Sequence, residues 1–182
     1  MKLNSKIFTF AILTAGITGA ASANPIIDVY AGGTFGVGGT AALWDGGHKN
    51  EAAQSFGGVF GIDIPLIRIE AEYNHIRNDL FSTNEAMLNA YFKMLSTLIH
   101  PYFGVGVGSI FGGHVDTDNT KYDVKTSVAY QGMLGVTFDI LAMPFAFDVE
   151  GRVLYSPNFV EIGTEKPDML QYDARAKVRY LF

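Results

Sequence analysis

The residues best suited to chemistry in this sequence are acids and bases that recur at every second position. Arg68, Glu70 and Glu72 follow this spacing in one segment, and Arg175 and Lys177 follow it in another. Closely spaced acids and bases can form a gate or a proton path, or they can pair as buried ions. Pairing is the plainer interpretation, because unpaired charge away from water costs several kcal/mol per ion.

The same alternation predicts the elements that carry these charges. In a β-strand, successive side chains point to opposite faces. Residues 172–182 therefore form a strand with an apolar, aromatic-ended face and a charged face, and residues 66–76 and 145–155 repeat the pattern. A soluble sheet packs its apolar face on a core, whereas a membrane barrel turns apolar residues out to lipid and polar residues into the lumen.

The charged faces together favour the membrane barrel. They carry six acids and six bases: Asp28, Arg68, Glu70, Glu72, Lys93, Asp148, Glu150, Arg152, Asp173, Arg175, Lys177 and Arg179. Such a balance is what ions buried in a lumen require. We therefore predict a lumen that is largely filled by paired charges.

The charges also predict a register between the last two segments. If Arg152 lies opposite Asp173, then Glu150 lies opposite Arg175 and Asp148 lies opposite Lys177, so all three pairs are complementary. A shift of two residues would instead place Arg152 opposite Arg175, a pair of like charges. We predict the complementary register.

The first residues have the form of a secretory signal peptide. Lys2 and Lys6 precede a short apolar run, and Ala21-Ser22-Ala23 then supplies a cleavage site of small residues. We expect a signal peptide at residues 1–23 and a mature domain at 24–182. Of the 13 Lys and Arg, removal of Lys2 and Lys6 leaves 11 against 18 acids, a net charge of -7. Such an acidic domain is poorly suited to nucleic acid, because phosphate contacts need a basic surface.

Eight long alternating segments define the expected fold class. They lie at 26–35, 53–62, 66–76, 85–95, 100–111, 124–139, 145–155 and 170–182. Short connections alternate with longer ones at 36–52, 77–84, 112–123 and 156–169, the order found in outer-membrane barrels. The chain has no cysteine, and no further stretch approaches the roughly 20 apolar residues of a membrane helix. We predict an all-β, eight-stranded, antiparallel up-and-down transmembrane β-barrel.

Four stretches resemble the small outer-membrane barrels of the opacity-protein and porin family. They are residues 66–73, the Pro-Tyr-Phe-Gly-Val-Gly-Val-Gly run at 101–108, residues 129–136 and the terminal strand. The resemblance implies that Tyr180 and Phe182 form the signal read by the outer-membrane assembly machinery. The lumen of eight strands is only wide enough for side chains, so we expect the inward glycines of 104–108 to make room for Tyr91 and Tyr102.

Several other chemistries have weaker support in the sequence. The glycines at 104–108 lie inside a strand pattern without a following helix, so a dinucleotide site is not expected. The histidines at 48, 75, 100 and 114 share no ligand spacing, and we expect neither a metal nor a cofactor. A lipid A-modifying enzyme would need a serine beside a histidine on the lipid-facing surface. Ser156 has no neighbouring histidine in the sequence, so we expect no enzyme.

The sequence therefore predicts a structural or surface-interaction protein of the Gram-negative outer membrane. Its expected partners are the lipid bilayer, lipopolysaccharide, the assembly machinery and a surface ligand bound by the four long connections. The connection that contains Trp44 and His48 is the first candidate for that contact. A narrow channel for ions or small solutes is the alternative, and a lipid A-modifying enzyme is the third hypothesis.

Overall fold

The computed structural model describes residues 27–44, 47–78, 81–94, 99–117, 120–123, 126–140, 143–159 and 168–182. The predicted signal peptide lies outside these residues. Every regular element among them is a strand, and they include no helix long and apolar enough to cross a membrane. The strands are β1 (Asp28–Trp44), β2 (Gly47–Asp63), β3 (Ile67–Asn78), β4 (Phe81–Lys93), β5 (Ile99–Thr117), β6 (Thr120–Asp123), β7 (Ser127–Asp139), β8 (Phe145–Ser156) and β9 (Asp168–Leu181).

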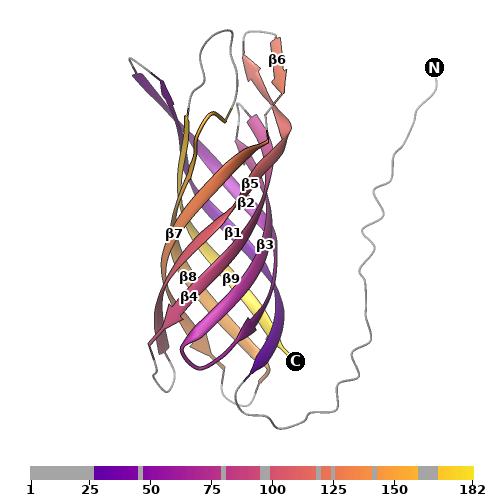
Figure 1. Cartoon of the computed structure of the whole chain (residues 1–182), viewed down its shortest axis with the longest axis vertical. Coiled ribbons are helices and arrows are strands. Elements are labelled where there is room, and N and C mark those ends of the chain that lie inside the picture. Colours follow the sequence, from indigo (N-terminus) through magenta and orange to yellow (C-terminus); the bar gives the residue numbers. More distant parts are fainter. Residues whose placement is uncertain are drawn as a thin grey trace, which may run out of the picture.

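Eight of these strands close into a barrel (Figure 1). Their order is β4-β3-β2-β1-β9-β8-β7-β5, every pairing is antiparallel, and β4 pairs with β5 to complete the ring. The short β6 pairs only with the far part of β5, as a hairpin that extends beyond the ring. The predicted eight-stranded antiparallel barrel is confirmed.

The two ends of the barrel differ. At one end, called here the turn end, β2 connects to β3, β4 to β5 and β7 to β8, and β9 finishes beside the start of β1. At the opposite, loop end lie the β1–β2, β3–β4 and β8–β9 connections and the β5–β6 hairpin (Figure 1). The connections alternate between the two ends as predicted, but the predicted difference in length is wrong for two of them: only residues 45–46 separate β1 from β2, and only 79–80 separate β3 from β4.

The predicted connection 36–52 is wrong in its extent. Ladder pairing between β1 and β2 continues from Gly36↔Ser55 to Trp44↔Gly47, so most of that range is strand. Likewise β5 and β6 occupy most of 112–123, and only 79–80 separate β3 from β4. Most of the predicted strands have about the length needed to cross a bilayer. The hydrogen-bonded ladder between β1 and β2 continues beyond that length.

Alternation along the strands produces the outer and inner surfaces. Every second residue of β8 is buried, from Ala146 to Ser156, and its outward residues are exposed. The exposed set includes Leu134 on β7, Val105 on β5 and the terminal Phe182. Aromatic residues near the strand ends are likewise exposed on the outer surface: Phe35, Tyr73, Tyr155, Tyr172, Phe92, Phe138, Phe145, Tyr180 and Phe182.

The predicted register between the last two strands is confirmed. Arg152 lies opposite Asp173, Glu150 opposite Arg175 and Asp148 opposite Lys177 in the β8–β9 ladder. Because side chains repeat every two residues, any odd shift would turn the charges of β9 out to the apolar surface. An even shift would keep them inside but would place like charges together.

Inward glycines provide space for large lumen side chains. A Cβ at Gly104 would collide with the Tyr91 ring and would lie 3.0 Å from Met133 Cε, and a Cβ at Gly135 would lie 2.5 Å from the Tyr102 hydroxyl. The two tyrosine rings pack edge to face, 5.4 Å between centroids. Gly104 thus makes room for the Tyr91 ring, as predicted, whereas the space for Tyr102 comes from Gly135, outside the predicted range.

This packing predicts that one glycine substitution destabilises the barrel and that a matched one leaves its stability unchanged. Gly104→Val should destabilise the barrel by about 1–3 kcal/mol, because its side chain must displace the Tyr91 ring from a filled interior. Gly132→Val is the matched control, since a Cβ at this outward glycine meets no atom within 4 Å. Urea unfolding in lipid vesicles gives both values. Equal stability of the two variants would show that the lumen has spare volume.

Candidate functional site

The lumen contains most of the charged residues predicted for it. Ten of the twelve predicted residues are buried, and Lys93 is half-buried. Asp28 is the exception, because it lies exposed at the first position of β1. Its placement in the lumen was wrong: its parity is inward, but the strand begins there, at the rim of the barrel.

Two acids that the sequence analysis did not assign complete the network. Asp63 ends β2 and contacts Arg179 and Lys93, and Glu85 on β4 contacts Arg152. The inward position of Glu85 could have been predicted from the sequence, because Glu85 shares its parity with Lys93 on the same strand. With Asp28 outside and these two inside, the ion-pair network of the described residues holds seven acids and six bases in place of the predicted six and six.

At the turn end, two arginines share one carboxylate. Asp148 Oδ2 accepts from Arg179 Nε at 2.8 Å and from Arg68 Nη1 at 3.2 Å. The Arg68 guanidinium lies 4.1 Å from the ring centroid of Tyr91 and 4.6 Å from that of Tyr102. Nε and Nη2 of Arg68 have no hydrogen-bond partner among the described residues. Cation–π contact with the two rings partly offsets the cost of burying this charge.

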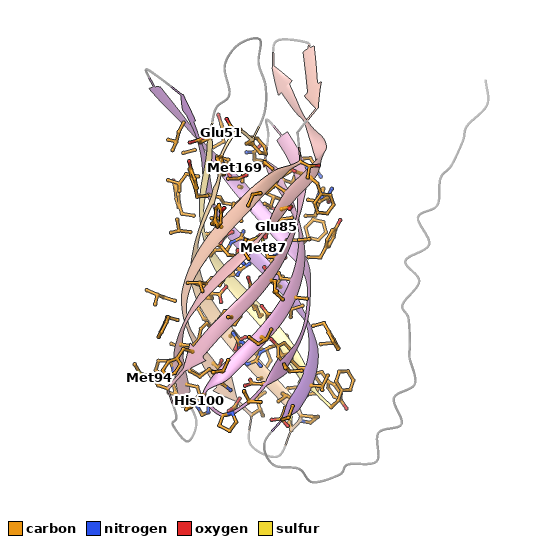
Figure 2. All side chains as sticks on the ribbon, viewed as in Figure 1. Glu51, Glu85, Met87, Met94, His100 and Met169 are labelled. Atoms are coloured by element: carbon orange, nitrogen blue, oxygen red, sulfur yellow. The ribbon has the colours of Figure 1, made fainter. Side chains whose placement is uncertain are left out.

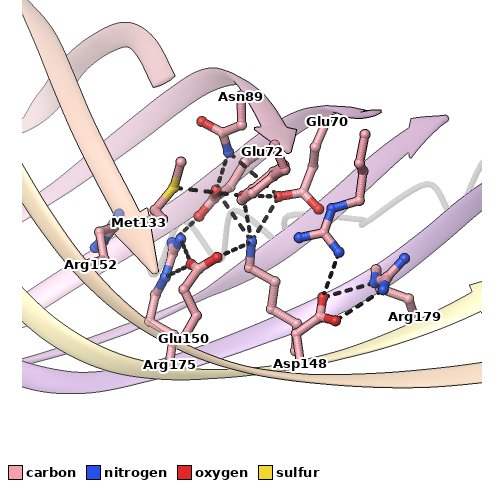
Figure 3. A network of polar contacts seen from close by, with 12 residues as sticks. Glu70, Glu72, Asn89, Met133, Asp148, Glu150, Arg152, Arg175 and Arg179 are labelled. Atoms are coloured by element: carbon pink, nitrogen blue, oxygen red, sulfur yellow. Dashed lines mark hydrogen bonds and ion pairs between the residues drawn. The ribbon is translucent and has the colours of Figure 1, made fainter. Parts of the chain in front are cut away.

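The middle of the lumen is organised around one arginine and one lysine (Figure 3). Arg175 contacts both Glu72 and Glu150, which come from opposite sides of the ring. Lys177 Nζ lies 2.8 Å from Glu70 Oε1 and 3.6 Å from Glu150 Oε2. Lys177 lies opposite Asp148 in the ladder, but its long side chain extends across the lumen to Glu70.

Tyrosine hydroxyls and amides donate to further carboxylate oxygens, although the buried Glu85 Oε2 has no partner among the described residues. Tyr30 and Tyr91 each donate to Glu70 at 2.8 Å, and Tyr102 donates to Glu150 at 3.0 Å. Asn89 Nδ2 donates to Glu72 at 2.6 Å. Each acid therefore has several partners, which is the condition under which buried charge is tolerated.

An apolar layer lies beyond the charges toward the loop end. Arg152 forms an ionic group with Asp173 at 3.0 and 2.6 Å and with Glu85. Apolar residues cluster inside the barrel in this part: Ile76, Met87, Ile110, Ala129, Leu154, Phe159 and Met169. Figure 2 shows Met169 nearer the loop end than Glu85, Met87 just below Glu85, and His100 at the opposite end. The parity of Ile76 and Leu154 could have predicted this layer, which the sequence analysis missed.

Ser156, the serine considered for catalysis, faces the lumen and not the lipid-facing surface. Ser156 is buried on the inward face of β8, where its Oγ lies 2.7 Å from Ser127 Oγ and donates to the Val128 carbonyl. His75 is on the outer surface, with Ser82 and Asn84 as its partners. The side chains of His48 and His114 lie outside the described residues, and His100 Nε2 is 2.8 Å from Asp139 Oδ2. The described part of the chain has no cluster of His, Cys, Asp and Glu suited to a metal.

Closed antiparallel barrels with an apolar outer band and a polar interior form the class of transmembrane β-barrels, and this chain has that fold. The fold is similar to the crystal structure of Neisserial surface protein A (NspA), with a TM-score of 0.60 and 16% identity over 82% of this chain and 96% of that one. It is also similar to the N-terminal β-barrel domain of Pseudomonas aeruginosa OprF, with a TM-score of 0.56 and 11% identity over 83% and 97% of the two chains. At these identities the likeness concerns the fold alone. No protein-family model matches the sequence, and no curated protein matches it.

The network predicts a large cost for removing its central cation. Arg175→Met should destabilise the barrel by about 3–5 kcal/mol, because Glu72 and Glu150 would keep buried charge without their shared partner. Arg77→Met, which changes an exposed arginine on β3, should shift stability by no more than about 0.5 kcal/mol. Chemical unfolding in lipid vesicles measures both, and a small effect of Arg175→Met would contradict the pairing argument.

Proposed function

We propose that this protein is a structural or surface-interaction protein of the Gram-negative outer membrane, of the opacity-protein and porin type, with a closed lumen. One observation carries the proposal: ion pairs and aromatic rings fill the lumen from Lys93 to Arg152, and an apolar layer follows them. A hydrated ion would have to displace paired side chains along this whole path. The interior therefore serves stability, which leaves interaction to the outer surface and the loop end.

Recognition in this proposal takes place at the loop end. The β1–β2 and β5–β6 hairpins extend beyond the closed ring there (Figure 1). At the base of the β8–β9 connection, Asp168 accepts from the Tyr155 hydroxyl at 2.6 Å and from the Asn158 amide at 3.0 Å. The ligand-binding ranges proposed from the sequence are 36–52, 77–84, 112–123 and 156–169. Their described residues lie toward this end, except at the start of 36–52, where Gly36 lies in the barrel wall opposite Arg175.

The exposed band and the terminal residues supply the other partners of the proposal. Lipid and lipopolysaccharide would surround the apolar outer face. Tyr180 and Phe182 would be read by the assembly machinery before insertion. In the folded barrel their rings pack 5.1 Å apart, and the Phe182 amide donates to the Val29 carbonyl.

Conductance in planar bilayers tests the closed lumen. The intact protein should give no stepwise current, because paired side chains occupy the lumen. A triple variant, Glu72→Ala, Glu150→Ala and Arg175→Ala, removes the central pairs together and should pass ions, provided that it still shows the heat-dependent gel shift of a folded barrel. Reproducible steps from the intact protein would favour the narrow channel instead.

Trimming the β5–β6 hairpin tests recognition at the loop end. A variant that joins Val115 to Tyr122 through a two-residue turn should keep the gel shift, because His114 and Val115 still pair with β4 and only the part of the hairpin beyond that pairing is removed. Cells displaying the intact protein should bind specific spots on an array of glycans and serum proteins, and cells with the trimmed variant should lose at least about tenfold of that signal. Unchanged binding, or none by the intact protein, would count against this hairpin as the recognition element.

A further inference from the structure

Three polar side chains on the outside of the barrel form a connected group. Ser82 Oγ lies 3.1 Å from His75 Nε2, and His75 Nδ1 lies 2.9 Å from Asn84 Oδ1. The β3–β4 ladder produces this arrangement, because His75 lies directly opposite Asn84 and Ser82 is two residues away on the same face of β4. The group belongs neither to the lumen network nor to the hairpins beyond the ring.

The hydrogen-bond partners determine which nitrogen of His75 carries the proton. The side-chain carbonyl of Asn84 can only accept, so His75 Nδ1 carries the proton and Nε2 is free to accept from the Ser82 hydroxyl. The Tyr73 hydroxyl also donates to Asn84 Oδ1, at 3.0 Å, and helps to hold that amide in place. A hydroxyl beside a base that is oriented by a third group is the arrangement of an activated serine nucleophile.

The position of the group suits an ester in a membrane lipid. Ser82, His75 and Asn84 are half-buried on the outer surface near the loop end of β3 and β4. The Phe56 ring packs 5.3 Å from the His75 ring, and Tyr73 is exposed beside it. The hydroxyl thus lies at the edge of the apolar band, where the acyl linkages of lipids meet water.

A neighbouring cation can stabilise the negative oxygen that forms during acyl transfer. Arg77 is exposed and lies directly opposite Ser82 in the ladder. Positive charge is a usual partner of an oxyanion. On the other side of β4, the β4–β5 register shifts at Thr83/Asn84 and leaves Gly112 as an extra residue with φ +58°. Such bulges are frequent beside active sites.

We propose that Ser82, His75 and Asn84 form a site that hydrolyses fatty-acid esters of membrane lipids. Ser82 Oγ attacks the ester carbonyl while His75 Nε2 takes its proton, and the departing alcohol then receives that proton. Water next attacks the acyl-serine with His75 again as base, which releases the fatty acid and restores Ser82. Asn84 is a positioning residue that holds the imidazole. The expectation of no enzyme rests on Ser156 and does not take Ser82 into account.

Covalent labelling tests the nucleophile directly. The full chain, refolded in detergent and lipid, should react with a fluorophosphonate probe, and peptide mass analysis should place the adduct on Ser82. Ser82→Ala should lose at least about a hundredfold of the labelling. Ser109→Ala should label normally, since Ser109 also faces outward but lies opposite Ala86 and Val128, not a histidine. Labelling that survives in Ser82→Ala would overturn the proposal.

Hydrolysis tests the base and its positioning residue. Vesicles of phosphatidylethanolamine and vesicles of lipid A are the two substrates, and fatty-acid release from either supports the proposal and identifies the source of the ester. His75→Gln should lower release by at least about a hundredfold. Asn84→Ala should lower it too, and Asn84→Asp should restore it, because a carboxylate can also accept from Nδ1. The gel shift confirms that each variant is folded.

Two results would refute the site. One is the absence of both labelling and release in folded wild-type protein, and the other is equal release by wild type and His75→Gln. Neither result bears on the closed lumen or on recognition by the hairpins, because the triad lies on the outer wall and is tested by different variants.

Discussion

The contact of Arg175 with Glu72 and Glu150 is the interaction on which the rest of the lumen depends. It joins β3 to the neighbouring strands β8 and β9, which are far from β3 in sequence, across the interior of the ring. Removing charge from water is costly, and the cost is recovered only when each ion has well-placed partners. The tyrosine hydroxyls of Tyr30 and Tyr102 and the amide of Asn89 supply those partners around it. The barrel is thus a membrane protein whose core is polar and whose surface is apolar.

The filled interior is the basis for placing the proposed functions on the outside. Among the described residues, ion pairs occupy the lumen, and Leu154, Ile76 and Met169 cluster inside it toward the loop end. The proposed functions therefore concern the outer wall and the loop end. The group formed by Ser82, His75 and Asn84 lies on that wall, and the extended hairpins lie at that end.

Much of this architecture could be predicted because a strand repeats every two residues. The faces of β3, β8 and β9 followed from parity, and the β8–β9 register followed from charge complementarity, with Glu150 opposite Arg175. The errors have equally simple causes. Asp28 has inward parity but lies at the rim, and the connection 36–52 was judged by membrane-crossing length although its ladder continues to Trp44 and Gly47.

The sequence by itself determined which side chains face the lumen and which face outward, because alternation is a local property of the chain. Only the tertiary structure decided which of them meet. Lys177 contacts Glu70 across the lumen and not its ladder neighbour Asp148. Arg68 contacts the rings of Tyr91 and Tyr102. Both contacts form because closure of the ring brings distant strands close together. The same holds on the outer wall. The sequence places Ser82 seven residues from His75, and only the register of β3 against β4 brings the hydroxyl to the imidazole.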